Sequence, residues 1–193
     1  MTSEWRGDVG AGVSAWLGGA PPPADPVALG PDADAESVAR TILLDQLTGR
    51  ARSREELRAR LAKKDVPEEI ATRLLDRFEE VGLVDDAAFA RSWVEGRRHA
   101  KGLATRALAL ELRRKGVDDE VAKEALAEVD PDDEEATARA LVRRKLRTVT
   151  RVDRATATRR LVGMLARKGY SPGLAYAVVR EELELDAQPI DTP

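Results

Sequence analysis

The amino-acid sequence predicts an all-α protein built from three tandem three-helix repeats. After residue 36 the chain is rich in Ala, Leu, Arg and Glu, which are strong helix formers, and it lacks the β-branched runs typical of strands. Apolar residues recur there at spacings of three and four, as on the buried face of an amphipathic helix. A short pattern also returns twice, at intervals of about 50 residues.

The repeated pattern consists of two leucines four residues apart, a lysine, a break in the helix and an apolar residue. Its copies are Leu57, Leu61, Lys64, Asp65 and Val66, then Leu108, Leu112, Lys115, Gly116 and Val117, then Leu161, Leu165, Lys168, Gly169 and Tyr170. A unit of about 50 residues buries little core alone, so we expect the units to stack into an elongated, curved body. We place them at residues 36–84, 85–130 and 131–184, before a flexible tail at 185–193.

In the first unit, apolar spacing predicts a helix through Ala39, Leu43 and Leu47, which Gly49 ends. Ser53 and Glu56 have the spacing of a capping box and open the second helix. The third helix starts at Pro67, a residue suited to a first turn, and continues to Gly82.

The other units follow the same plan. Asp85 and Asp86 cap a helix that carries Phe89 and Trp93, whose spacing of four favours a core position over a platform for stacking bases. The leading helix of the third unit opens at Asp132 with Glu135 and carries apolar residues as far as Val149. The last helices of these two units start at Asp118-Asp119 and at Ser171-Pro172.

Residues 1–35 contain six of the fourteen glycines and five of the ten prolines, without a sustained apolar period. This composition predicts a disordered N-terminal arm. The first ten residues contain no apolar segment of a secretory signal, and no run of about 20 apolar residues follows anywhere in the chain. We therefore expect a cytoplasmic protein with no membrane partner.

Several kinds of chemistry are disfavoured by composition. There is no cysteine, and the single histidine, His99, lies in a basic stretch without acids at ligand spacing. The acids at 130–135 precede a predicted helix, where its dipole favours them, and the two common glycine-rich nucleotide fingerprints are absent. We expect no enzyme, metal, cofactor or small-molecule substrate, and we disfavour a carboxylate-dependent hydrolase because most acids lie at helix starts or opposite bases.

Charge is unevenly distributed although the net charge is −3. Residues 118–135 contain ten acids and one base, whereas residues 139–168 contain eleven bases and one acid. The second block predicts a surface for a polyanion or an acidic protein groove; the alternative is internal pairing with the acidic block. The candidate partner-binding residues are Arg97, Arg98, Lys101, Arg106, Arg113, Arg114, Lys115, Arg139, Arg143, Arg144, Lys145, Arg147 and Arg151.

The central unit contains Gly82-Leu83-Val84-Asp85-Asp86 with Phe89-Ala90, followed by Arg97, Lys101-Gly102, Glu111-Leu112 and Lys115-Gly116. On these residues it resembles the RecX family of bacterial recombination regulators. The threefold repeat extends it over residues 36–183. Of the matching residues, Asp85, Asp86, Phe89, Gly102, Glu111, Leu112 and Gly116 have the character of caps, core positions and helix stops.

The resemblance implies three three-helix repeats and a non-catalytic role in DNA repair, homologous recombination and the SOS response. It implies binding to the RecA–DNA filament and inhibition of the ATPase, strand-exchange and co-protease activities of RecA. Single- or double-stranded DNA is a further expected partner. The alternative interpretation is a sequence-tolerant DNA-binding helical protein that acts without RecA.

Overall fold

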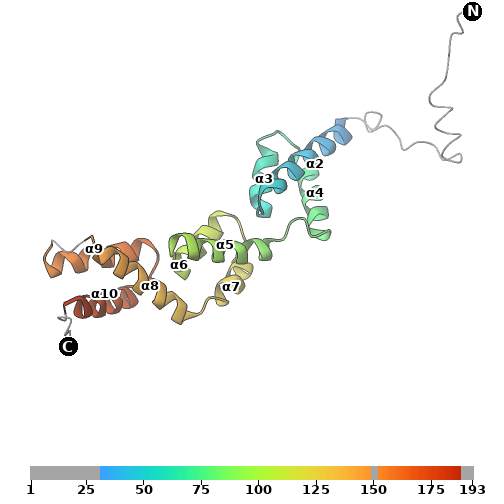
Figure 1. Cartoon of the computed structure of the whole chain (residues 1–193). Helices are drawn as coiled ribbons and strands as arrows, with labels where there is room; N and C mark the ends of the chain where they lie inside the picture. The colour runs from blue at the N-terminus through green and yellow to red at the C-terminus, as the bar shows by residue number, and fades with distance from the viewer. Residues whose placement is uncertain (1–30, 149–151, 188–193) are drawn as a thin grey trace, which may run out of the picture.

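The computed structural model describes residues 31–148 and 152–187, and all regular secondary structure within these ranges is helical (Figure 1). The helices are α2 (Pro31–Gly49), α3 (Arg54–Ala62), α4 (Glu68–Glu80), α5 (Asp86–Lys101), α6 (Thr105–Arg114), α7 (Asp119–Ala127), α8 (Pro131–Leu146), α9 (Arg154–Arg167) and α10 (Pro172–Ala187). Most of the predicted arm, the end of the predicted tail and the candidate Arg151 lie outside the described residues.

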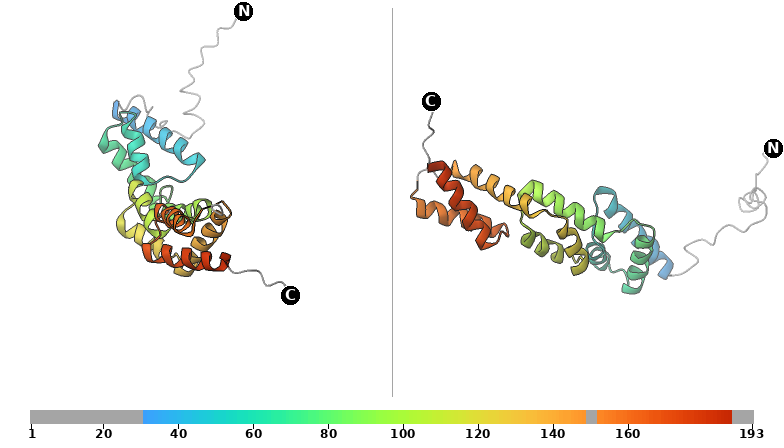
Figure 2. Two further views of the ribbon diagram at one scale, coloured as in Figure 1. Left: turned by 90° about the vertical axis from the view of Figure 1, so that its left-hand side faces the viewer. Right: turned by 90° about the horizontal axis from the view of Figure 1, so that it is seen from below.

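Each helix packs mainly against the other two helices of its own repeat. The three repeats α2–α4, α5–α7 and α8–α10 follow one another along an elongated, bent body (Figures 1 and 2). The first and last helices of this array lie at its opposite ends. The predicted fold class of three tandem three-helix repeats is thus confirmed.

The repeated leucines form three separate cores. Leu57 and Leu61, Leu108 and Leu112, and Leu161 and Leu165 are each at most 1% exposed, and each pair belongs to the core of its own repeat. Burying one such side chain contributes about 1.5–3 kcal/mol. The apolar residue that ends each pattern, Val66, Val117 or Tyr170, lies in the same core as its leucines.

Two helices begin earlier than predicted. Helix α2 begins at Pro31, within the predicted arm, and α8 begins at Pro131 with Asp130 rather than Asp132 as its N-cap. In both cases a proline occupies the first helical position, where its fixed φ suits a helix and its missing N–H costs no hydrogen bond. The Asp130 carboxylate accepts from the Asp132 backbone N–H at 2.9 Å.

The first junction between repeats lies where Lys115-Gly116 contacts the start of α3. The Ser53 hydroxyl donates to the Lys115 carbonyl at 2.6 Å, and the Lys115 ammonium donates to Glu56 at 2.6 Å. Gly116 has a φ of +72°, and a Cβ added to it would lie 2.3 Å from the Cβ of Glu55. Both the left-handed backbone and the close approach require glycine here.

The second junction repeats this arrangement with Lys168-Gly169 against the start of α6. The Ala104 N–H donates to the Lys168 carbonyl at 2.9 Å, and the Lys168 ammonium donates to the Lys101 carbonyl. A Cβ added to Gly169, whose φ is +93°, would lie 2.6 Å from both the Cβ and the backbone nitrogen of Ala107. The Lys-Gly corner of one repeat is therefore the element that docks on the repeat before it.

A second contact also recurs at both junctions. The Asp86 carboxylate, in the first turn of α5, accepts from the Arg54 backbone N–H at 2.8 Å. Glu134, in the first turn of α8, accepts from the Thr105 backbone N–H at 2.8 Å. In each case an acid of the following repeat satisfies a free N–H at the start of the preceding repeat's second helix. Tyr170 strengthens the second junction, since its hydroxyl donates to the Gly102 carbonyl at 3.2 Å.

Candidate polyanion-binding surface

Two arginines of α8 are held by acids of α10. The Arg143 guanidinium donates to both carboxylate oxygens of Glu182, at 2.7 and 2.9 Å, and Glu182 is 3% exposed. Arg139 lies 2.7 Å from Glu181 and also pairs with Glu135, one turn away on its own helix. These hydrogen bonds and charges raise the pKa of both arginines. Arg139 and Arg143, predicted to face a partner, are engaged within the third repeat.

Two cations of the second repeat cover the indole of Trp93. The guanidinium carbon of Arg97 lies 4.1 Å and the ammonium of Lys115 4.7 Å from the ring centroid, within reach of cation–π attraction. The indole N–H donates to Glu111 at 2.9 Å, and Arg97 lies 3.0 Å from the same carboxylate. Phe89 is buried and stacks on Trp93 with ring centroids 5.6 Å apart. This arrangement fits the predicted core role better than a base-stacking platform.

Two further candidates have acidic partners at longer distances. Arg98 lies 3.6 Å from Asp133 across the second junction. Within the basic block 139–168, Arg139 is the residue that pairs with the acidic block, through Glu135. Arg113 lies 3.3 Å from Asp119, where both side chains are largely exposed. Exposed pairs of this kind contribute about 0–1 kcal/mol, so Arg113 is readily available to a partner.

Six predicted partner-binding residues are exposed and have no ion-pair partner within 4 Å among residues 31–148 and 152–187: Lys101, Arg106, Arg114, Arg144, Lys145 and Arg147. They come from α5, α6, α8 and the C-cap of α8, and so from the second and third repeats. A set of cations without counter-charges creates a positive potential that attracts a polyanion. We call these six residues the open basic set.

The residues that carry the family resemblance have structural contacts. Asp85 is the N-cap of α5 and accepts from the Ala88 N–H at 2.8 Å, whereas Asp86 reaches across the first junction. Burial raises the pKa of Asp86, and the hydrogen bond from Arg54 only partly opposes this effect. Gly102 ends α5 with a φ of +58°. Leu112 is buried, and Glu111 accepts the hydrogen bond from the Trp93 indole. Gly116 lies against Glu55 at the first junction.

Lys168 is a junction position that the candidate set omitted. It is the third-repeat equivalent of Lys115, and it clamps the loop between α5 and α6 through both its carbonyl and its ammonium group. The signal in the sequence was the repeat itself, since the three lysines align. Their contacts differ because Lys115 meets a carboxylate and Lys168 meets a carbonyl.

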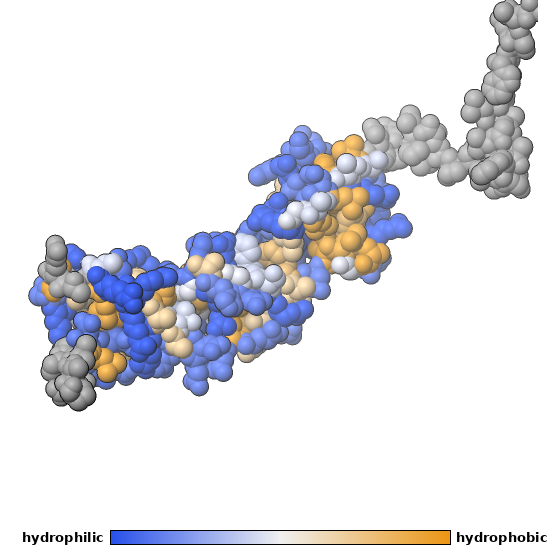
Figure 3. All heavy atoms as spheres, viewed as in Figure 1, coloured by the Kyte–Doolittle hydropathy of each residue, from blue (hydrophilic) through white to orange (hydrophobic). Residues whose placement is uncertain are grey.

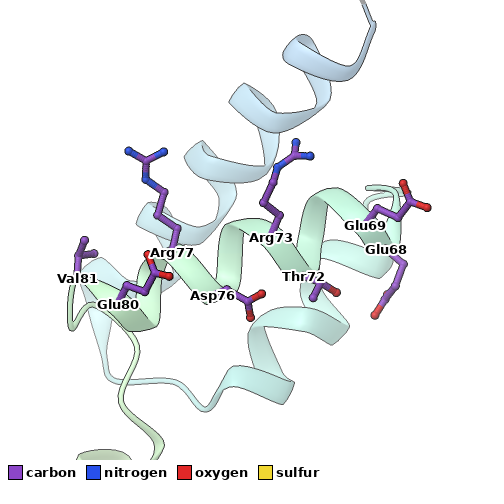
Figure 4. A pocket seen from close by; sticks show the side chains of 8 residues that line it. All are labelled: Glu68, Glu69, Thr72, Arg73, Asp76, Arg77, Glu80 and Val81. Atoms are coloured by element: carbon purple, nitrogen blue, oxygen red, sulfur yellow. The ribbon is translucent and has the colours of Figure 1, made fainter.

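The hollows on the surface differ in their relation to the open basic set: Arg106 lines one of them and Arg147 another, but no member of the set lines the groove along α4. The groove in Figure 4, about 820 Å³, runs along the outer face of α4 and is lined by Glu68, Glu69, Thr72, Arg73, Asp76, Arg77, Glu80 and Val81. These side chains stand along one helix and point in different directions instead of converging on one point. Exposed apolar surface gathers on the first repeat (Figure 3), where Val81 and Leu83 are at least half exposed.

The described part of the chain has neither a cluster of metal-ligating side chains nor a helix suited to crossing a membrane. No group of three or more His, Cys, Asp or Glu side chains there is placed to hold a metal ion. No helix within these residues combines the length and the apolar character that crossing a membrane requires. His99 is exposed, with Nδ1 3.0 Å from the Glu95 carbonyl oxygen.

Three tandem three-helix repeats define an α-helical repeat protein. Comparison with known proteins specifies the family. The models of the first, second and third RecX three-helix domains match residues 39–78, 85–126 and 132–179. The chain belongs to the RecX family of regulatory proteins.

Curated relatives support this assignment over most of the chain. Regulatory protein RecX of Streptomyces coelicolor is 51% identical over 167 residues, covering 86% of this chain and 84% of that protein. Regulatory protein RecX of Mycobacterium avium is 51% identical over 154 residues, covering 79% of this chain and 89% of the relative.

Solved structures show the same fold at lower identity. The crystal structure of RecX from Lactobacillus salivarius is 22% identical and superimposes with a TM-score of 0.71, over 79% of this chain and 99% of that one. A second crystal structure of regulatory protein RecX, also 22% identical, gives a TM-score of 0.72 over 89% of this chain and 85% of that one.

Proposed function

We propose that this chain is a non-catalytic, cytoplasmic regulator of RecA that binds the RecA–DNA filament and inhibits its ATPase, strand-exchange and co-protease activities. The observation that carries the proposal is the open basic set on the second and third repeats of a RecX-family body. An elongated body can contact several successive subunits of a filament, and unpaired cations match a partner rich in phosphates and carboxylates.

The ion pairs within the protein limit which cations are available to contact the filament. Arg139 and Arg143 are already neutralised by the acids of α10, whereas Arg144 and Lys145 in the last turn of α8 and Arg147 at its C-cap have no such partners. Binding through Arg144, Lys145 and Arg147 does not require any ion pair of the folded protein to break. We therefore assign filament contact to the open basic set and not to every base of residues 139–147.

The test is the single-strand-dependent ATPase of RecA, titrated with this protein from far below one copy per RecA upward at fixed salt. Inhibition at strongly substoichiometric ratios would support engagement of the filament and would favour action at its ends over uniform coating. Absence of inhibition at excess protein would overturn the proposal. Matched substitutions then locate the surface: Arg144→Gln and Arg147→Gln together should weaken inhibition, and Arg60→Gln with Lys63→Gln should not.

The competing function is DNA binding that does not need RecA. The open basic set favours it as well, because cations release counterions from any DNA backbone. It predicts similar affinities for naked DNA and for the filament, with a steep loss as salt rises. If the protein binds naked DNA weakly and the filament tightly, RecA regulation is favoured over DNA binding without RecA.

A further inference from the structure

Three cationic residues, Lys101, Arg144 and Lys168, come from segments that adjoin at the second junction. Lys168 reaches the C-terminal end of α5 by donating from its ammonium group to the Lys101 carbonyl. Gly102, the next residue, lies against Leu141 of α8, since a Cβ added to Gly102 would be 3.0 Å from a methyl carbon of that leucine. Arg144 follows Leu141 by three residues and therefore lies one turn further along the same face of α8.

The equivalent lysines, Lys115 and Lys168, have different partners at the two junctions. At the first junction Lys115 donates to the Glu56 carboxylate, so its charge is neutralised at 2.6 Å. At the second junction Lys168 donates to an uncharged carbonyl, and the residue equivalent to Glu56 is Ala107. The same backbone arrangement therefore carries a compensated charge at one junction and an uncompensated one at the other.

The electrostatics of Lys168 agree with this geometry. Burial lowers its pKa first, and the charges of Arg144 and Lys101 lower it further. None of the three side chains has an ion-pair partner within 4 Å in the described ranges 31–148 and 152–187. Like charges held together raise the free energy of the unbound protein, and an anion at this point relieves their repulsion.

We infer that Lys101, Arg144 and Lys168 form a binding site for DNA backbone phosphates at the junction of the second and third repeats. This inference rests on the proposed function and specifies which component of the filament the site contacts. DNA is favoured over an acidic protein surface because duplex DNA presents one charge per about 1.7 Å of its axis, a charge density that suits three cationic residues at one junction. The site exists only while the two repeats are docked, so binding also stabilises the junction.

The experiment removes two of the charges without removing a hydrogen bond. Lys101 uses its backbone carbonyl for the clamp, so Lys101→Gln combined with Arg144→Gln leaves the donor and acceptor of the Lys168 contact in place. Arg60→Gln with Lys63→Gln is the matched control, since it removes two exposed charges from the first repeat. Binding of both variants to fluorescent single-stranded and duplex oligonucleotides is measured across a salt series by anisotropy.

For the junction variant, the slope of log affinity against log salt should become shallower by about 1.4 for single strands and about 1.8 for duplex. The control should keep the wild-type slope. The melting temperature of the free junction variant at low salt should equal or exceed that of the wild type, because repulsion is relieved. A structural role for these cations predicts a lower melting temperature instead.

Three outcomes separate the inference from the function on which it rests. An unchanged salt slope in a folded junction variant overturns the phosphate site. Unchanged DNA binding with lost inhibition of RecA also overturns it, and assigns the cations to acidic side chains of the filament. Wild-type protein that binds DNA with the expected variant effect but does not inhibit RecA supports the site and overturns the proposed function alone.

Discussion

The ammonium of Lys115 and the carboxylate of Glu56 are joined by a hydrogen bond of 2.6 Å that crosses from the second repeat to the first. The two residues are 59 positions apart, and both side chains are less than one quarter exposed. The Lys115 carbonyl meanwhile accepts from the Ser53 hydroxyl. One lysine thus holds the start of α3 through its main chain and its side chain together.

Glu56→Gln should lower the free energy of unfolding by about 1–2 kcal/mol at pH 7, because the charge-assisted bond from Lys115 becomes a neutral one. Burial alone would raise the pKa of Glu56, but the hydrogen bond and the charge of Lys115 outweigh it and lower the pKa. A carboxyl group with a lowered pKa stabilises the fold above its unfolded pKa, and that contribution is lost as the pH falls.

Urea denaturation at pH 7 and near pH 3 checks this prediction. The difference between wild type and Glu56→Gln should be present at pH 7 and shrink toward zero as the pH falls below about 4. Glu69→Gln, an exposed position on α4, serves as the control and should change stability by less than about 0.5 kcal/mol at either pH. A difference that does not depend on pH would contradict the assigned ion pair.

Gly116→Ala should destabilise more than Gly82→Ala, although both glycines have a φ of +72°. At Gly82 an added Cβ meets nothing within 4 Å, so the cost is the left-handed backbone alone, about 1 kcal/mol. At Gly116 the added Cβ also clashes with Glu55, so the first and second repeats must separate. Chemical denaturation measures both costs, and small-angle scattering should show an expanded shape for Gly116→Ala. Equal losses of unfolding free energy in the two variants, with unchanged scattering by Gly116→Ala, would show that the Lys115-Gly116 corner does not dock on the first repeat.

Local features of the fold could be predicted from the sequence, whereas contacts between distant helices could not. The spacing of Leu108 and Leu112 reports burial directly, because a helix places residues four apart on one face. Arg143 and Arg144 are indistinguishable in the same terms, since both belong to one basic run. Their difference arises from α10, which brings Glu182 against one of them across 39 residues. Asp86 was likewise predicted as a cap for its own helix, but it caps α3 in the preceding repeat.

The difference between these two arginines gives a prediction. Arg143→Gln should lower the melting temperature, because it leaves the buried Glu182 without its bidentate partner. Arg144→Gln should change stability by less than about 0.5 kcal/mol and weaken filament binding instead. Thermal unfolding and the RecA ATPase assay, applied to both variants, separate the two effects. Equal stability of the two variants would show that the α8–α10 pairs contribute little.

Trp93→Leu should reduce stability without reducing affinity for single-stranded DNA. The substitution removes the stack with Phe89, the cation–π contacts and the indole donor to Glu111, at a cost of about 2–4 kcal/mol. Phe89, Arg97 and Lys115 already contact the indole, so a base would have to displace one of them to stack on it. Stability is measured by urea denaturation, and affinity by anisotropy at a temperature where the variant is folded.

A base-stacking role makes the opposite prediction for Trp93→Leu. Loss of one stacked base costs about 1–3 kcal/mol of binding, or about 5- to 150-fold in affinity, and is little affected by salt. Loss of the Lys101 and Arg144 charges instead changes the salt slope. Comparing the two variants across one salt series therefore distinguishes aromatic from electrostatic binding. An affinity loss in folded Trp93→Leu that persists at high salt would show that the indole leaves its two cations to contact DNA.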